Sequence, residues 1–133
     1  MTQFPFLKSW VKTLLYFYPK DNTPGCTLEA QDFTRLKHDF EALGILIIGV
    51  SKDSEDSHAK FRDNCHLGIE LIADTDGKLH EQFGVIGEKK NYGKVYIGVI
   101  RSTFLLDEHG NILKEWRNVK AKGHAEKILK ELS

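Results

Sequence analysis

A cysteine near the start of a predicted helix is the residue of this sequence best suited to chemistry. Cys26 follows the segment Thr23-Pro24-Gly25, which lies just after a short apolar run. Thr23 is a favourable N-cap, and Pro24 then falls at the first helical position, where its missing N–H costs nothing. This register places Cys26 in the first turn, among N–H groups without an intrahelical partner and at the positive end of the helix dipole. Such surroundings stabilise a thiolate, and a sulfur beside a loop can be reached by small molecules, so we expect nucleophilic sulfur chemistry.

Two other roles for Cys26 stay open at this point. One is structural, with the thiol only filling space at the helix start. The other is dithiol–disulfide exchange. The residue three before Cys26 is Thr23, so the sequence has no Cys-x-x-Cys pair. None of its three prolines lies directly before the strand predicted near Arg101, where a thioredoxin has a cis-proline. Both absences count against a general disulfide reductase.

The elements that must position Cys26 follow from the apolar pattern. Thr13–Tyr18 and Ile45–Val50 are apolar on both faces, as is typical of strands covered on both sides in a parallel sheet. Between them, apolar residues from Cys26 to about Leu43 recur mostly at helical spacing. Strand, helix and strand in this order predict a right-handed βαβ unit.

The rest of the chain adds a second half to this unit. We predict a helix over about Ser54–His66, a short strand at Leu71–Ile72, a short helix over Gly77–Phe83, a loop over Gly84–Gly98, a hairpin of Arg101–Leu106 with Ile112–Trp116, and a closing helix over His124–Leu132. A βαβ unit followed by a ββα unit predicts an α/β, thioredoxin-like fold with a central sheet flanked by helices. The length predicts one domain over residues 1–133.

Composition excludes several classes of function. Nineteen Lys and Arg balance nineteen Asp and Glu, which argues against binding to nucleic acid or to an anionic membrane surface. No apolar run approaches the roughly 18 residues of a membrane-spanning helix. Met1–Trp10 is not a convincing signal peptide, and two cysteines are too few for a disulfide framework, so we expect a reducing, cytoplasmic setting. We expect no metal and no bound cofactor, since the six histidines lack metal-ligand spacing and no nucleotide-binding motif occurs.

The segment around Cys26 resembles a known family. Pro19-x-x-x-Thr23-x-x-Cys26 is the active-site pattern of the peroxiredoxins, and the string FYPKDNTPGCTLEAQDF is similar to the bacterioferritin comigratory protein, or peroxiredoxin Q, subfamily. The similarity covers nearly the whole chain from about residue 13 and continues in Gly49-Val50-Ser51-x-Asp53-Ser54, Ser57-His58-x-Lys60-Phe61 and Ile100-Arg101-Ser102-Thr103-Phe104-Leu105.

The resemblance implies a thiol peroxidase that reduces hydrogen peroxide or organic hydroperoxides without metal, flavin or haem. Cys26 would be the peroxidatic cysteine, which attacks a peroxide oxygen and becomes a sulfenic acid. Thr23 would orient the peroxide, Arg101 would hold the thiolate and polarise the O–O bond, and Pro19 would shield the pocket. Glu29, one turn beyond Cys26, is a candidate for positioning Arg101. From local physics alone, Arg101 would be a surface residue at a strand start.

The resemblance also concerns the second cysteine. Many members have a resolving cysteine five residues after the first, a position that is Gln31 here, whereas others place it in the next helix, where Cys65 lies. The alternative is that Cys65 is a buried structural thiol. A disulfide needs Cα atoms roughly 4.4–6.8 Å apart. We therefore expect the first turn around Cys26, the Cys65 helix, or both to unwind during turnover, and an external dithiol protein such as thioredoxin to reduce the disulfide.

The sequence departs from the family pattern at its start. Only 12 residues precede Thr13–Tyr18, where members of the family usually have a longer segment with extra early strands, so the departure affects the early hairpin and the edge of the pocket. The rival functions are a thiol–disulfide oxidoreductase and a non-catalytic thioredoxin-like binding module. We expect a monomer or a weak dimer.

Overall fold

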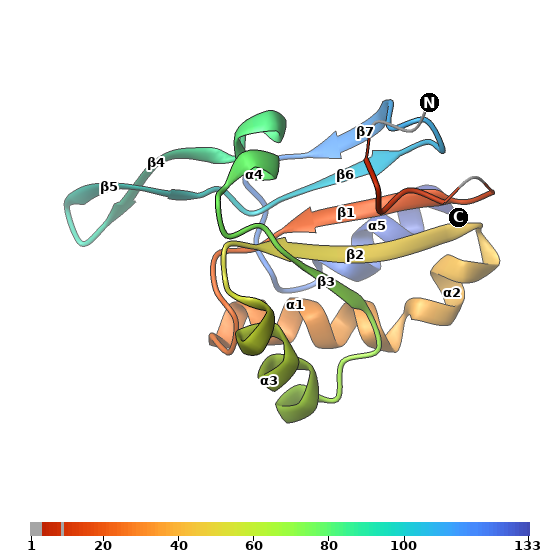
Figure 1. Cartoon of the computed structure of the whole chain (residues 1–133), viewed down its shortest axis with the longest axis horizontal. Coiled ribbons are helices and arrows are strands. Elements are labelled where there is room, and N and C mark those ends of the chain that lie inside the picture. Colours follow the sequence, from red (N-terminus) through yellow and green to blue (C-terminus); the bar gives the residue numbers. More distant parts are fainter. Residues whose placement is uncertain (1–3, 9) are drawn as a thin grey trace.

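The central sheet consists of β1 (Lys12–Phe17), β2 (Ile45–Ser51), β3 (Glu70–Ala73), β6 (Ser102–Leu106) and β7 (Ile112–Trp116). The computed structural model describes residues 4–8 and 10–133. The order across the sheet is β3-β2-β1-β6-β7 (Figure 1). β1, β2 and β3 run parallel, whereas β6 is antiparallel to β1 and β7 is antiparallel to β6. This topology confirms the predicted βαβ unit followed by a ββα unit.

The predicted helix from Cys26 to Leu43 is two helices. They are α1 (Pro24–Arg35) and α2 (Lys37–Ala42), and Leu36 between them leaves helical geometry at φ −94° and ψ 4°. Leu36 and Phe40 are both buried in the core at this break. The apolar spacing in the sequence is continuous through the break, so it predicts a helix but not the bend. The remaining helices are α3 (Glu55–Cys65), α4 (Lys78–Phe83) and α5 (His124–Leu132).

Helices and the N-terminal segment cover the two faces of the sheet unequally. Alternate residues of β1 face opposite sides, so Leu14 and Tyr16 join the hydrophobic cluster under α1, α2, α3 and α5, while Leu15 and Phe17 join the cluster on the other face. That second cluster includes Phe83 of α4. Burial on both faces explains why Thr13–Phe17 is entirely buried.

The segment Gly84–Gly98, which the sequence predicted to be a loop, is a hairpin. β4 (Ile86–Asn91) and β5 (Lys94–Val99) pair antiparallel and extend away from the central sheet (Figure 1). Tyr92 and Gly93 connect them with φ of 51° and 78°, the left-handed conformation of both central residues in a type I′ turn. The glycines and lysines suggested a loop, but alternation from Val95 to Val99 was the available signal for a strand.

The chain before β1 adds no strand among residues 4–8, 10 and 11. Phe4 and Leu7 instead pack into the cluster that contains Phe83 and Phe104. A short apolar segment therefore covers part of this face of the sheet. Within residues 4–8 and 10–133, no helix is long and apolar enough to cross a membrane.

Candidate active site

Cys26 lies in the first turn of α1, where the sequence placed it. Thr23 occupies the N-cap position in an extended conformation, with φ −90° and ψ 154°, and Pro24 is the first helical residue. The Thr27 N–H donates to the Thr23 carbonyl at 2.8 Å and closes this first turn. Cys26 is only 1% exposed, so the expectation of an open sulfur is wrong for this state. Access by a small molecule requires a shift of the groups that cover the thiol.

Arg101 covers the sulfur and gives it a charged hydrogen-bond donor. It immediately precedes β6, and its Nη2 donates to Cys26 Sγ at 3.3 Å. Its Nη1 donates to Oε1 of Glu29, and its side chain is 15% exposed. A Cβ on Gly25 would lie 3.4 Å from Nη2, so the glycine leaves room for this approach. The surface role that local physics gave Arg101 is wrong, because folding places it against α1.

Glu29 is buried, and only one of its two carboxyl oxygens has a hydrogen-bond partner among the described residues. Burial raises the pKa of Glu29 to about 7 even though Arg101 lowers it. Its Oε2 has no hydrogen-bond partner among the described residues. For Arg101, burial lowers the pKa, but the charges of Glu29 and Cys26 and their hydrogen bonds raise it above the ordinary value. The guanidinium is therefore a fixed positive charge between a sulfur and a carboxyl group that titrates near neutrality.

Tyr16 is a site neighbour that the sequence analysis did not single out. Its ring stacks on Phe33 of α1 with centroids 4.6 Å apart, and its hydroxyl is buried without a partner among the described residues. Burial, then the negative charges of Glu29 and Cys26, raise the pKa of Tyr16 well above its ordinary value. A Cβ on Gly49 would lie 2.8 Å from the Tyr16 hydroxyl, so a glycine in the neighbouring strand is required. The signal in the sequence was the alternation of β1, which places Tyr16 on the face of α1.

The other predicted residues lie around this centre at different depths. Thr23 is half-buried, and its Oγ1 donates to the Lys20 carbonyl at 2.8 Å. Its side chain makes no capping hydrogen bond, so the cap is one of backbone position alone. Pro19 is half-buried in the loop between β1 and α1. The hydroxyl therefore fixes the loop in front of Cys26 rather than the helix end.

Cys65 is the last residue of α3 and is partly buried. It packs against the hydrophobic cluster that includes Cys26, and both cysteines are free thiols in this structure. The structure thus brings Thr23, Arg101 and Glu29 around Cys26, and it leaves Cys65 on a separate helix. The sequence analysis also missed Asp21, whose side chain connects the loop before Cys26 to α3.

Comparison with known proteins covers most of the chain. Residues 6–115 match the model of the AhpC/TSA family. A putative peroxiredoxin bcp of Helicobacter pylori strain J99 is 49% identical over 121 residues, which are 91% of this chain and 80% of that protein. Peroxiredoxin Bcp of Bacillus subtilis strain 168 is 50% identical over 90% of this chain and 76% of its own length.

Solved structures give the same result. The bacterioferritin comigratory protein of Xanthomonas campestris, studied for alkyl peroxide reduction, matches with a TM-score of 0.86 and 44% identity over 93% of this chain and 79% of that chain. The thioredoxin-like fold is therefore confirmed. With a family match over most of its length and relatives at half identity, the chain belongs to the AhpC/TSA family, among the peroxiredoxins of the Bcp or peroxiredoxin Q type.

Proposed function

We propose that Cys26 is the peroxidatic cysteine of a thiol-dependent peroxidase that reduces hydrogen peroxide and organic hydroperoxides. The observation that supports this most strongly is the 3.3 Å hydrogen bond from Arg101 Nη2 to Cys26 Sγ in the first turn of α1. A fixed cation and the helix N-terminus both stabilise a thiolate at this position. The solved relative named for alkyl peroxide reduction supports the class of substrate.

The first chemical step is a displacement at oxygen. The Cys26 thiolate attacks the terminal oxygen of the peroxide, an S–O bond forms and the O–O bond breaks. The leaving oxygen takes the electron pair and a proton to become water or an alcohol, and Cys26 becomes a sulfenic acid. Negative charge develops on the leaving oxygen, so a donor that is already oriented lowers the barrier. Arg101 supplies that donor, and Glu29 accepts from its other η nitrogen and orients it.

Thr23 and Pro19 shape the loop over which the peroxide enters. The Thr23 hydroxyl lies at the N-cap of the helix that begins with Pro24, and its hydrogen bond to Lys20 leaves the oxygen lone pairs available to a peroxide O–H. Pro19 has no N–H and restricts the loop backbone. We assign the orientation of the peroxide to Thr23 and the shielding of the sulfur to Pro19.

Cys65 is the candidate resolving cysteine. Its thiolate attacks the Cys26 sulfenic sulfur, the S–S bond forms, and the S–O bond breaks with loss of hydroxide, which takes up a proton to form water. Cys65 ends α3 and packs at the edge of the cluster that contains Cys26. The two cysteines approach when α3, the first turn of α1, or both unwind. Two of the similar structures are of Xanthomonas campestris peroxiredoxin Q with different cysteines changed to serine, which directs attention to two cysteines in that relative.

Recycling completes the cycle. A dithiol protein of thioredoxin type reduces the Cys26–Cys65 disulfide and is itself oxidised to a disulfide. The protein acts as a single domain, as a monomer or weak dimer, in the cytoplasm. This setting agrees with the balanced charge of the chain and with two cysteines that need to return to the thiol state.

Intact mass after one equivalent of hydrogen peroxide tests the proposal. We expect the reduced parent to lose about 2 Da, Cys65→Ser to gain about 16 Da, and Cys26→Ser not to react. A parent that only gains about 16 Da would show that Cys65 is structural and that an outside thiol resolves. A parent that does not react within minutes would contradict the peroxidase, and faster reaction of Cys26 with a disulfide than with peroxide would favour an oxidoreductase.

A further inference from the structure

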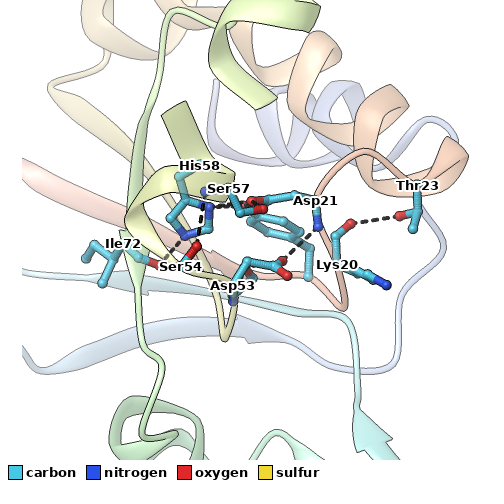
Figure 2. Close-up of polar contacts among 10 residues, drawn as sticks. Lys20, Asp21, Thr23, Asp53, Ser54, Ser57, His58 and Ile72 are labelled. Atoms are coloured by element: carbon cyan, nitrogen blue, oxygen red, sulfur yellow. Dashed lines mark hydrogen bonds and ion pairs between the residues drawn. The ribbon is translucent and has the colours of Figure 1, made fainter. Parts of the chain in front are cut away.

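A buried carboxylate connects the loop before Cys26 to the helix that ends in Cys65. Asp21 lies in the β1–α1 loop, and its side chain is 2% exposed. Oδ1 accepts from the Tyr18 hydroxyl at 2.6 Å, and Oδ2 accepts from Ser57 Oγ at 2.7 Å and faces His58 Nδ1 at 2.7 Å. Ser57 and His58 both belong to α3, and Figure 2 shows their side chains directed at Asp21.

A protonated His58 ring satisfies both of its hydrogen-bond partners. Nδ1 faces the Asp21 carboxylate, and Nε2 faces the Ile72 carbonyl at 3.0 Å (Figure 2). Both partners only accept hydrogen bonds, so both ring nitrogens must donate. Burial lowers the pKa of His58, but its hydrogen bonds to Asp21 and Ile72 raise it, and the net direction is upward. For Asp21, burial raises the pKa, but the hydrogen bonds from His58, Tyr18 and Ser57 have the larger effect, so the net pKa is lowered.

The same loop is also tied to the end of β2. The Asp21 backbone N–H donates to Asp53 Oδ2 at 2.8 Å, and Ser51 Oγ donates to the same oxygen at 2.8 Å. The loop before Cys26, the end of β2 and the first turns of α3 therefore form one hydrogen-bonded block. A movement of α3 away from the sheet must first break the bonds of Ser57 and His58 to Asp21.

The other contacts of α3 are mostly apolar packing and end caps. His58 and Phe61 are its buried residues, and most of its other side chains are polar. Its C-cap, His66, has a φ of 53°, a left-handed conformation that is costly for a residue with a Cβ. Ser54 caps the other end by accepting from the Ser57 N–H at 3.1 Å. The His58 end of α3 is therefore held by polar contacts with Asp21, and the Cys65 end is held by the apolar packing of Phe61 and Cys65 against the core cluster.

We propose that the Asp21–His58 ion pair is a latch that holds α3 against the active-site loop and so sets how readily Cys65 reaches the Cys26 sulfenic acid. The latch rests on the proposed resolving role of Cys65 for its effect on turnover. Its effect on the opening of α3 does not depend on that role. Asp21 and His58 are positioning residues, since neither touches the reacting sulfur.

Loss of the His58 proton opens the latch. A neutral imidazole donates from one nitrogen only, so either Asp21 or the Ile72 carbonyl loses its hydrogen bond, and the buried Asp21 charge loses its counter-ion. The charged groups that face His58 are Asp21 and Asp53, and Tyr18 stays neutral because burial raises its pKa. Since the pKa of His58 is raised in the folded state, the latch is closed below the ordinary histidine pKa and is lost as the pH rises through the folded value. Disulfide formation should therefore be slowed at low pH.

The test compares disulfide formation in the parent and in His58→Gln after a single pulse of hydrogen peroxide, followed by mass from the sulfenic to the disulfide form. His80→Gln is the control for loss of a buried histidine–aspartate contact, because His80 is also fully buried, with Nδ1 2.6 Å from Asp74 Oδ2, but it lies in α4 and burial lowers its pKa. Because the titration of the Cys65 thiol affects the variant and the parent alike, it cancels when the rate of the variant is divided by the rate of the parent at the same pH. We expect a ratio of about ten near pH 6 for His58→Gln that falls toward one as the pH rises, as loss of a buried counter-ion predicts. A ratio that does not depend on pH, or the same ratio for His80→Gln, would overturn the latch.

Hydrogen exchange in the Cys65→Ser background separates the latch from the resolving role. With His58 intact, α3 amides should exchange faster relative to α5 amides as the pH rises through the His58 titration, after correction for intrinsic exchange. This measurement needs no disulfide and no folded His58 variant. A constant ratio of α3 to α5 exchange would refute the latch. A rising ratio, combined with a parent protein that only gains about 16 Da from peroxide, would refute only the role of Cys65.

Discussion

Glu29 and Arg101 form an ion pair beside the Cys26 sulfur although 72 residues separate them in the chain. Glu29 lies one helical turn after Cys26 and is fully buried, and Arg101 reaches it from the start of β6. One η nitrogen of Arg101 binds the carboxyl group and the other binds the thiol. Because the guanidinium is planar, the position of Glu29 determines the direction in which Arg101 presents its second donor.

Replacement of Arg101 by lysine should remove this two-sided contact while keeping a positive charge. We expect the second-order rate constant of Cys26 with hydrogen peroxide to fall about 100-fold, the scale seen when one donor to a developing negative charge is lost. Stopped-flow kinetics would measure it. Arg117→Lys is the control, since Arg117 lies over the Phe104 ring at 5.0 Å and donates to the carbonyls of Gly84 and Phe83. Equal losses in both variants would contradict the role of Arg101.

Glu29→Gln should change how stability depends on pH. Burial raises the pKa of Glu29 to about 7 in the folded state, whereas the unfolded carboxyl titrates near its ordinary value of 4.5. A raised folded pKa means that the contribution is present below 4.5 and is lost as the pH rises to about 7. The parent should therefore lose up to about 3 kcal/mol of unfolding free energy from this group between those values. Urea unfolding at pH 4.5 and 8 should show a smaller loss in Glu29→Gln, and an unchanged loss would disprove the assignment. Glu115→Gln, at a half-exposed carboxylate, is the control.

Thr23 should be replaceable by serine but not by valine. Serine keeps a hydroxyl that can donate to the Lys20 carbonyl, whereas valine keeps the shape and loses the donor. If the hydroxyl orients the peroxide, Thr23→Val should lower kcat/KM for hydrogen peroxide about tenfold, and Thr23→Ser should stay within a few-fold of the parent. Similar values for the two variants would show that the Thr23 hydroxyl does not orient the peroxide.

His124 should make the protein sensitive to acid. It is buried at the start of α5, and its Nε2 lies 2.8 Å from Thr103 Oγ1. Burial, followed by the charges of Arg101 and Lys127, lowers the pKa of His124 to about 4. A depressed folded pKa contributes stability above the unfolded value near 6.5, and this contribution, at most about 3 kcal/mol, is lost as the pH falls toward 4.

Chemical denaturation from pH 7 to pH 4 would measure this loss. His124→Gln should be less stable than the parent at pH 7, because its amide does not reproduce the packing of the imidazole on Phe33. It should also lose less stability on acidification. A variant that loses as much as the parent would show that other groups cause the acid sensitivity.

Much of the fold was predictable because its signals are local. The apolar runs of β1 and β2 and the turn between β6 and β7 each reflect the burial or backbone preference of a few neighbouring residues, and their order determines the topology. The β4–β5 hairpin was not predicted, because glycine and lysine dominate its composition and its pairing depends on a turn at Tyr92-Gly93. The bend at Leu36 was also missed, since packing of the two helices on the core decides it.

The placement of Cys26 in the first turn of a helix can be predicted from neighbouring residues alone, because N-cap geometry, proline placement and the helix dipole act within a few residues. The tertiary structure is what brings Arg101 to that sulfur across 75 residues, places Glu29 against its other η nitrogen, and joins Asp21 in the loop to His58 of α3. The strength of an interaction between two charged groups depends on the distance between them and on how deeply they are buried. Both quantities are set by which faces of the sheet and helices meet, and neither can be read from the spacing of residues along the chain.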